Sequence, residues 1–309
     1  RLDATWVKMT KELVTNEKVH IIAYNTTEKN RILGLLNTAN IPLTNVDFNI
    51  FQTNDVWVRD NGPIYVKDHT NTLKIEDWKF NGWGNKASYS KCNIIPNSIG
   101  AATITPVINL NNSLCLEGGA FEMDGQGTLL ATKSSILNSN RNPGKTQAQV
   151  ESILTTNLGA TKFIWLNGVA GLDITDMHID GFAKFVDNTT LVTMNNSELL
   201  YWELSAADIN TLYNAKNKNN VTYNKVYLPL TQNNVVTTYG KNLGYKGSYC
   251  NYYVANSKVL VPNYNDPKDA VANSIIQSLY PTRTVVGIDC RNLYEQGGMI
   301  HCVTQQQPL

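Results

Sequence analysis

The chain has 309 residues, of which 42% are hydrophobic and 17% are charged, and its formal net charge is +1. A chain of this length can bury one large core or two smaller ones, and its near-neutral charge argues against nucleic acid or an anionic membrane as the main partner. No apolar run approaches the roughly 18 residues that a membrane-spanning helix needs. We therefore expect a globular protein.

The first 50 residues predict alternating helices and strands. Apolar residues at helical spacing predict a helix over residues 4–14, and the segments 19–24 and 46–51 are typical of strands. Thr27 is the expected cap of a second helix that runs to Leu36. Further helices are expected at residues 145–155, 205–216 and 266–279. This alternation indicates an α/β fold.

Four later segments predict β-hairpins, because each has two strand-like runs around a polar turn: 64–75, 121–131, 182–192 and 252–261. An ionisable residue stands four positions before the first strand in three of them, namely Asp60, Glu117 and His178. The intervals between these residues are 57 and 61 positions, as expected for a repeated supersecondary unit. Asn251 and Cys302 stand directly before later strands.

This layout predicts a radial architecture. Several mixed units around a pseudo-axis would each present a loop residue to a shared cleft, as the blades of a propeller do. The alternative is a coincidental spacing of glycine-rich turns. If the loops converge, they bring together one histidine, several carboxylates and one cysteine.

Cys302 is the expected nucleophile. It follows Gly297-Gly298 and precedes a polar Thr-Gln-Gln-Gln run, surroundings that suit a wet cavity better than a packed interior. Asp60, Glu117 and Asp180 supply up to three negative charges, which would raise the pKa of a thiol unless a cation offsets them. A guanidinium fits best, because carboxylates match its fork of donors.

These residues predict the hydrolytic deimination of a guanidinium. Asp60 and Asp180 would hold the guanidinium nitrogens while Cys302 attacks the central carbon. His178 would protonate the departing nitrogen and then activate water, so that ammonia and a ureido product form. The reaction requires neither a metal nor another cofactor.

Six motifs, in this order, resemble those of the agmatine deiminase and bacterial-type peptidylarginine deiminase family: WVRDNGP (57–63), FNGWG (80–84), LEGG (116–119), NSNRNP (138–143), TDMHIDGF (175–182) and GMIHCVTQQQP (298–308). The resemblance runs from about residue 4 to the end of the chain. It implies a pentein fold, a five-bladed α/β propeller, in which residues 1–309 form a single catalytic deiminase domain. It also implies site roles for Cys302 as nucleophile, His178 as acid and base, Asp60 and Asp180 as guanidinium ligands, Glu117 as a site carboxylate, and Asn251 as a polar site residue.

Family members usually begin with a further segment before the helix that here starts near residue 4, so the resemblance implies an incomplete first blade. A separate N-terminal fragment and a homo-oligomer both stay open. Motif detail favours agmatine, converted to N-carbamoylputrescine, as the small guanidino substrate. Arginine in a peptide is the alternative, with Lys86 or Lys91 to bind its carboxylate. An amidinotransferase and a non-catalytic cation-binding homologue are further alternatives.

Trp57 is expected to bind substrate through a cation–π contact, with simple packing as the alternative. Arg59, beside Asp60, is expected to be structural, and His301 should point away from Cys302 if that segment is extended.

The compartment is read from sequons and cysteines. Asn-x-Ser/Thr sequons favour secretion, whereas a cytoplasmic protein rich in asparagine would produce them by chance; they lie at Asn25, Asn111, Asn188, Asn195 and Asn220. The cysteines lack the CxxC spacing of a zinc cluster. Disulfide pairing is left open for Cys92, Cys115, Cys250 and Cys290.

Overall fold

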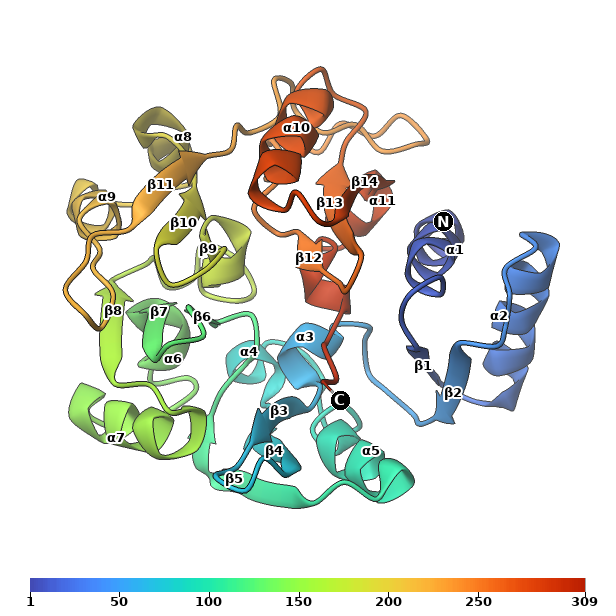
Figure 1. Cartoon of the computed structure of the whole chain (residues 1–309), viewed down its shortest axis with the longest axis horizontal. Coiled ribbons are helices and arrows are strands. Elements are labelled where there is room, and N and C mark those ends of the chain that lie inside the picture. Colours follow the sequence, from blue (N-terminus) through green and yellow to red (C-terminus); the bar gives the residue numbers. More distant parts are fainter. Residues whose placement is uncertain (309) are drawn as a thin grey trace. The chain divides into compact units, whose positions relative to one another are not determined.

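The computed structural model describes residues 1–308, which form two compact units. The first unit combines residues 1–53 with 229–303, and the second combines residues 54–228 with 304–308. Both are built from small sheets and helices, so the predicted α/β class is confirmed (Figure 1). The described residues contain five separate sheets, none of which closes on itself.

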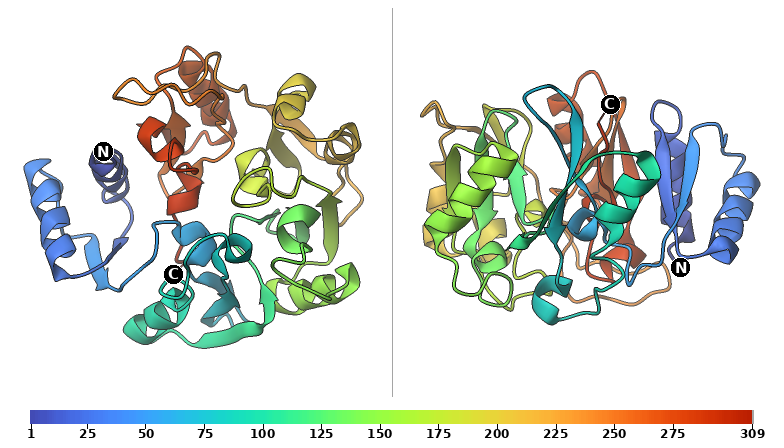
Figure 2. Two further views of the ribbon diagram at one scale, coloured as in Figure 1. Left: turned by 180° about the vertical axis from the view of Figure 1, so that it is seen from behind. Right: turned by 90° about the horizontal axis from the view of Figure 1, so that it is seen from below.

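The N-terminal part of the first unit has the predicted alternation of helices and strands: α1 (Asp3–Leu13), β1 (Val19–Ala23), α2 (Thr26–Thr38) and β2 (Val46–Ile50). β1 and β2 pair in parallel, and α2 packs against both, as Figure 2 also shows. The expected cap Thr27 is wrong. The side chain of Asn25 accepts a hydrogen bond from Glu28 N at 2.8 Å, because asparagine before the first turn reaches a free N–H group.

The C-terminal part of the first unit contains β12 (Tyr253–Val254), β13 (Lys258–Asn263), α10 (Asp269–Leu279), β14 (Thr284–Asp289), α11 (Arg291–Tyr294) and the 3₁₀ turn η2 (His301–Val303). β12 and β13 form the predicted hairpin, and β14 pairs in parallel with β13. The N-terminal helix α1 packs against β13 and β14, where the Thr5 hydroxyl donates to Asp289 O at 2.8 Å. The two ends of the first unit are therefore joined by packing.

The second unit contains three sheets of three strands each. Its strands are β3 (Ile64–Lys67), β4 (Leu73–Lys79), β5 (Val107–Cys115), β6 (Phe121–Met123), β7 (Thr128–Thr132), β8 (Lys162–Leu166), β9 (Lys184–Phe185), β10 (Thr190–Thr193) and β11 (Asn224–Tyr227). Its helices and turns are α3 (Val58–Asn61), α4 (Gly82–Asn85), α5 (Ile95–Thr103), α6 (Lys133–Ile136), α7 (Gln147–Leu158), the 3₁₀ turn η1 (Ile179–Gly181), α8 (Asn196–Tyr201) and α9 (Ala206–Tyr213).

A shared strand order supports the predicted repeat. In all three sheets of the second unit, and in the β12–β13–β14 sheet, an antiparallel hairpin is followed by a third strand that runs parallel to the second. The hairpins predicted at residues 64–75, 121–131 and 182–192 are thus confirmed. The β1–β2 sheet has only the parallel pair within the described residues.

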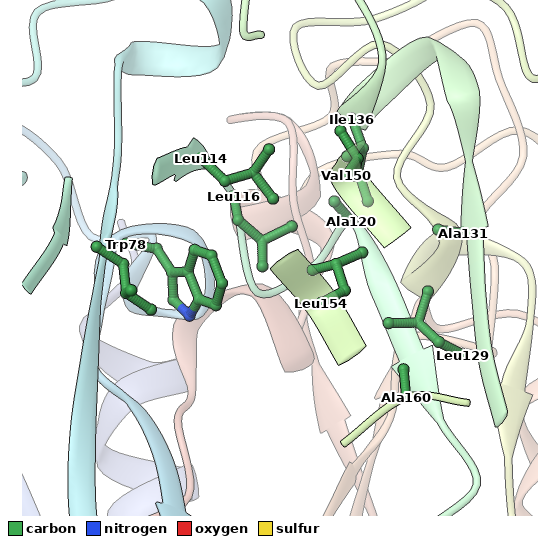
Figure 3. Close-up of a cluster of buried hydrophobic side chains, with 11 residues drawn as sticks. Trp78, Leu114, Leu116, Ala120, Leu129, Ala131, Ile136, Val150, Leu154 and Ala160 are labelled. Atoms are coloured by element: carbon green, nitrogen blue, oxygen red, sulfur yellow. The ribbon is translucent and has the colours of Figure 1, made fainter. Parts of the chain in front are cut away.

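One apolar core fixes the loop that carries Glu117. Side chains from β4, β5, β7 and α7, among them Trp78 and Leu154, pack together in this core (Figure 3). Leu116 and Ala120, on the two sides of the Glu117-Gly-Gly segment, are both buried in it. Burial of both flanks holds the loop in place, because each would lose packing if the loop moved.

None of the five cysteines is part of a disulfide, so the structure contains none of the pairings that the sequence left open. Four of them are buried and Cys302 is partly exposed. Within residues 1–308, no helix combines the length and apolarity needed to cross a membrane.

Candidate active site

Four of the predicted site residues converge in the second unit. Asp60 lies in α3 before β3, Glu117 lies between β5 and β6, and His178 and Asp180 lie at the η1 turn before β9. All four side chains are buried. His178 Nε2 lies 2.8 Å from Glu117 Oε2, and its Nδ1 lies 3.5 Å from Asp60 Oδ1. The repeated position before each hairpin therefore does gather these groups.

Gly119 lies among these four residues, and because it has no side chain it leaves an open space between them. A Cβ atom at this position would lie 2.7 Å from His178 Nδ1, 2.8 Å from Asp60 Oδ1 and 3.1 Å from Asp180 Oδ2. Gly119 N also donates to Asp60 Oδ1 at 3.1 Å, and Gly119 O accepts from Asp180 N at 3.4 Å. The sequence marked this glycine as part of a motif, but it gave no sign that three site residues surround it.

His178 is oriented by Glu117 and carries a proton at neutral pH. Burial alone would lower its pKa, but the carboxylates of Asp60, Glu117 and Asp180 outweigh burial and raise the pKa of His178 to about 9. The ring Nε2–H donates to Glu117, which leaves Nδ1 facing Asp60 and the space beside Gly119. Nδ1 is thus the ring nitrogen that does not contact Glu117.

Burial also raises the pKa values of the two aspartates. Burial raises the pKa of Asp180 to about 7, although the positive charge of His178 opposes this effect. The pKa of Asp60 is raised by burial too, against the opposing charge of His178 and a 2.9 Å hydrogen bond from Trp83 Nε1. Because burial raises the pKa of both carboxyl groups, a cation placed between them would stabilise their ionised forms.

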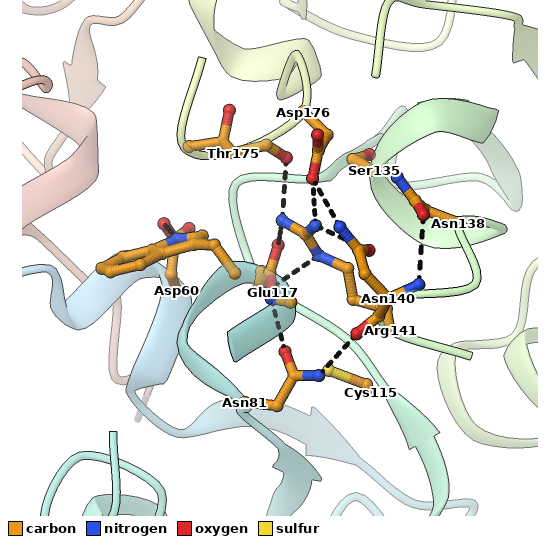
Figure 4. A network of polar contacts seen from close by, with 12 residues as sticks. Asp60, Asn81, Cys115, Glu117, Ser135, Asn138, Asn140, Arg141, Thr175 and Asp176 are labelled. Atoms are coloured by element: carbon orange, nitrogen blue, oxygen red, sulfur yellow. Dashed lines mark hydrogen bonds and ion pairs between the residues drawn. The ribbon is translucent and has the colours of Figure 1, made fainter. Parts of the chain in front are cut away.

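Arg141 and Asp176 complete the polar network, and sequence reasoning gave neither a role. Arg141 donates from Nε to Glu117 Oε1 at 3.0 Å and from Nη2 to Glu117 Oε2 at 3.2 Å (Figure 4). Its Nη1 donates to Asp176, which also accepts from Lys86. Arg141 and Asp176 lie inside two of the recognised motifs. The sequence did contain one indication of a role for Arg141: an arginine within a recognised motif, on a chain with several carboxylates, is a candidate partner for one of them.

Three further predicted residues of the second unit have other contacts: Trp57 and Arg59 are packed, and the exposed Lys86 is in an ion pair. Trp57 is half-buried and packs against the cluster of Phe80, Trp83 and Cys92. Arg59 is buried and its Nη2 donates to Gln306 Oε1 at 2.8 Å. Lys86, one of the two lysines considered for carboxylate binding, is instead paired with Asp176 at 2.7 Å.

Cys302 and Asn251 lie together in the first unit. The Cys302 thiol donates to Asn251 Oδ1 at 3.5 Å, and the same oxygen accepts from His301 N at 2.9 Å. Asn251 is fully buried, so its side-chain amide has little freedom to move and holds the Cys302 thiol in one position. The segment is a 3₁₀ turn and not extended, so the alternation expected for His301 does not apply. His301 is nevertheless buried.

Among residues 1–308, no group of three or more His, Cys, Asp and Glu side chains is arranged to hold a metal ion.

The chain matches a family described as Porphyromonas-type peptidyl-arginine deiminase over residues 1–308. It is 31% identical to the agmatine deiminase of Pseudomonas fluorescens, and the match covers 87% of this chain and 79% of that protein. A solved structure of a candidate arginine deiminase from Porphyromonas gingivalis is 32% identical and has a TM-score of 0.86, covering 98% of this chain and 88% of that one.

A cysteine-to-serine variant of C. jejuni agmatine deiminase, solved with substrate bound, is 26% identical and has a TM-score of 0.82, covering 97% of this chain and 85% of that one. These structural relatives belong to the pentein family and share the mixed α/β fold. The chain therefore belongs to the Porphyromonas-type peptidyl-arginine deiminase family, and it is a hydrolase that acts on carbon–nitrogen bonds.

Proposed function

We propose that the protein is an agmatine deiminase, which converts the guanidinium of agmatine into the ureido group of N-carbamoylputrescine and releases ammonia. The observation that carries this proposal is the buried cluster around Gly119. Burial raises the pKa of both Asp60 and Asp180, and a carboxyl oxygen of each lies close to the position of a Cβ atom on Gly119. A guanidinium in this space would stabilise the ionised forms of both carboxyl groups and would supply hydrogen-bond donors to both aspartates.

Two observations favour agmatine over an arginyl peptide. The curated relative named above is an agmatine deiminase, and so is the relative that was solved with substrate bound. Lys86 is held in an ion pair with Asp176, so it is committed to a carboxylate of the protein itself. The name of the matching family keeps peptidyl arginine as the second candidate substrate.

The first half of the proposed reaction breaks the carbon–nitrogen bond. Asp60 and Asp180 accept hydrogen bonds from the guanidinium nitrogens. Cys302, reacting as a thiolate that the positive charge of the substrate stabilises, adds to the central carbon and forms a carbon–sulfur bond. His178 enters protonated and gives its Nδ1 proton to the departing nitrogen, which leaves as ammonia. A positively charged thiouronium remains on Cys302.

The second half hydrolyses this intermediate. His178, now neutral, takes a proton from water as the water oxygen adds to the same carbon. The carbon–sulfur bond then breaks, which returns the thiolate and a protonated His178. The product loses one proton to solvent and leaves as a neutral ureido compound. Glu117 keeps Nε2 occupied throughout, so the same Nδ1 serves in both halves.

Two further residues have binding roles in this proposal. Asn251 holds the thiol of Cys302 through its buried amide oxygen. Trp57 presents an aromatic surface to the substrate; what supports this is its half-buried position beside Trp83, which binds Asp60.

We further propose that residues 1–309 act as one catalytic domain and that the five sheets are the blades of a pentein propeller. The strand order that four sheets share supports this view. The β1–β2 sheet would be the incomplete first blade, because its parallel pair corresponds to the second and third strands of the other four.

The test is a side-by-side assay of ammonia release, with mass spectrometry of the product, on agmatine, free arginine, and internal and C-terminal arginyl peptides. We expect turnover of agmatine with water alone, and no change of product when an amine acceptor is added. Cys302→Ala should abolish turnover, whereas Cys290→Ala, a buried thiol of the same unit, should retain it. Turnover by Cys302→Ala would refute the covalent mechanism.

A further inference from the structure

A continuous chain of ion pairs leads from the protein surface to His178. Lys86 Nζ lies 2.7 Å from Asp176 Oδ2, and the same oxygen accepts from Arg141 Nη1. Arg141 holds both oxygens of Glu117, and Glu117 Oε2 contacts His178 Nε2 at 2.8 Å. All five residues lie in the second unit. Each contact in this chain is a hydrogen bond between charged groups. A change of charge at Lys86 therefore changes the electrostatic environment of His178.

Burial along this chain is steeply graded. The Lys86 side chain is 30% exposed, whereas those of Asp176 and Arg141 are 2% and 1% exposed. Solvent therefore screens only the first member, and interactions among the inner members act at a lower effective dielectric constant. Lys86 is the most exposed of these five residues, and it is the member of the network on which solvent acts most strongly.

Lys86 also holds two strained loops together. Its Nζ donates to Asp173 O at 3.2 Å and Ile174 O at 3.0 Å. In that loop Asp176 and Met177 have φ values of 60° and 73°, and in its own loop Trp83 has a φ of 55°. Non-glycine residues with positive φ are costly and persist where surrounding contacts hold them, commonly at functional sites.

We propose that Lys86 is a positioning residue that sets the proton affinity of His178 through Asp176, Arg141 and Glu117. Without the positive charge of Lys86, Asp176 keeps Arg141 as its remaining cation. Arg141 is then drawn towards Asp176 and neutralises Glu117 less well. Glu117 in turn stabilises the protonated ring of His178 more strongly, and the direct repulsion between Lys86 and that ring is also lost.

Both effects have the same sign, so loss of the charge strengthens proton binding by His178. The other carboxylates that face His178 are Asp60 and Asp180, and Asp180 is influenced by Lys184 and Glu122. None of these four is bonded to Lys86 in the network, so they act as a constant background. A histidine that binds its proton too tightly is a poor base for activating water. Lys86 thereby keeps His178 able to serve in both halves of the proposed reaction.

The test separates the charge of Lys86 from its hydrogen bonds. Lys86→Gln keeps a donor for the carbonyls of the loop but removes the charge, and Lys86→Arg keeps both. Lys74→Gln is the matched control, because Lys74 pairs with Asp68 at 2.8 Å and has an exposed fraction of 31% but lies on the β3–β4 hairpin. The titration of His178 is followed by NMR without substrate, and its signal is assigned with His178→Gln.

We expect Lys86→Gln to move the His178 titration upward by about 0.5 to 1 pH unit, while Lys86→Arg and Lys74→Gln titrate as the wild type. A Lys86→Gln protein that titrates as the wild type overturns the inference, whatever its stability. The activity arm rests on the proposed function: the pH limb of kcat should move by the same amount, with KM nearly unchanged. The NMR arm does not depend on the substrate, so failure of the inference and failure of the proposed function can be told apart.

Discussion

Gly119→Ala is a direct test of the space that the site residues share. The added methyl group would lie 2.7 Å from His178 Nδ1 and 2.8 Å from Asp60 Oδ1, whereas ordinary contact begins at 3.4 Å. One or both groups must therefore retreat by roughly 0.6 Å. Neither has free room, because Glu117 holds His178 and Trp83 holds Asp60. The methyl group would also occupy the space where a guanidinium is proposed to bind.

Displacements of this size in positioned groups cost up to about 100-fold in rate, so we expect kcat/KM to fall by roughly 10-fold to 100-fold. Overpacking should also cost about 1–3 kcal/mol of stability, so the assay is run well below the melting temperature. Gly181→Ala is the matched control. It lies in the η1 turn beside Asp180, but the nearest atom to its Cβ would belong to Trp202 at 3.6 Å, an ordinary contact. Wild-type activity in Gly119→Ala, or an equal loss in Gly181→Ala, would refute the reasoning.

The charges of the site give three further predictions. Burial raises the pKa of Asp180 in the folded protein from 3.8 to about 7. The stability that this group contributes is therefore full below pH 3.8 and is lost as the pH rises through 7. Asp180→Asn should flatten this part of the pH profile of the unfolding free energy measured in urea, and an unchanged profile would contradict the prediction. Arg141→Met leaves Glu117 and Asp176 poorly paired and should lower the free energy of unfolding by about 3–5 kcal/mol. Arg31→Met, at an exposed position, should lower it by less than about 1 kcal/mol. Equal losses of stability in chemical denaturation would contradict a stabilising role for the Arg141 network. Agmatine should release protons on binding near pH 7, because its charge lowers the pKa of Asp180, and calorimetry in buffers of different ionisation enthalpy that finds no release would contradict this.

The sequence predicted that several ionisable side chains would lie together, and it did so where these residues precede a recognisable hairpin. Asp60, Glu117 and His178 each precede a hairpin, and hairpins are recognisable from strand alternation around polar turns. Because these hairpins occupy equivalent places in similar sheets, their preceding loops were expected to meet, and those of the second unit do. The cap of α2 could not be assigned as well, since Asn25 and Thr27 are both good caps and only the backbone geometry decides between them.

Arg141 shows where such reasoning fails. It lies after α6, in a loop outside the position that carries the other site residues, and nothing in the spacing of the motifs connects it with Glu117. Its role follows from burial. A carboxylate that orients a histidine in a dry interior needs a cation behind it, because its own charge would otherwise lack a partner on that side. The requirement for such a cation can be stated from the residues alone, but which of the 26 lysines and arginines meets it depends on how the loops pack. The same logic continues outward through Asp176 to Lys86, and it ends there because Lys86 is the first link that water can stabilise.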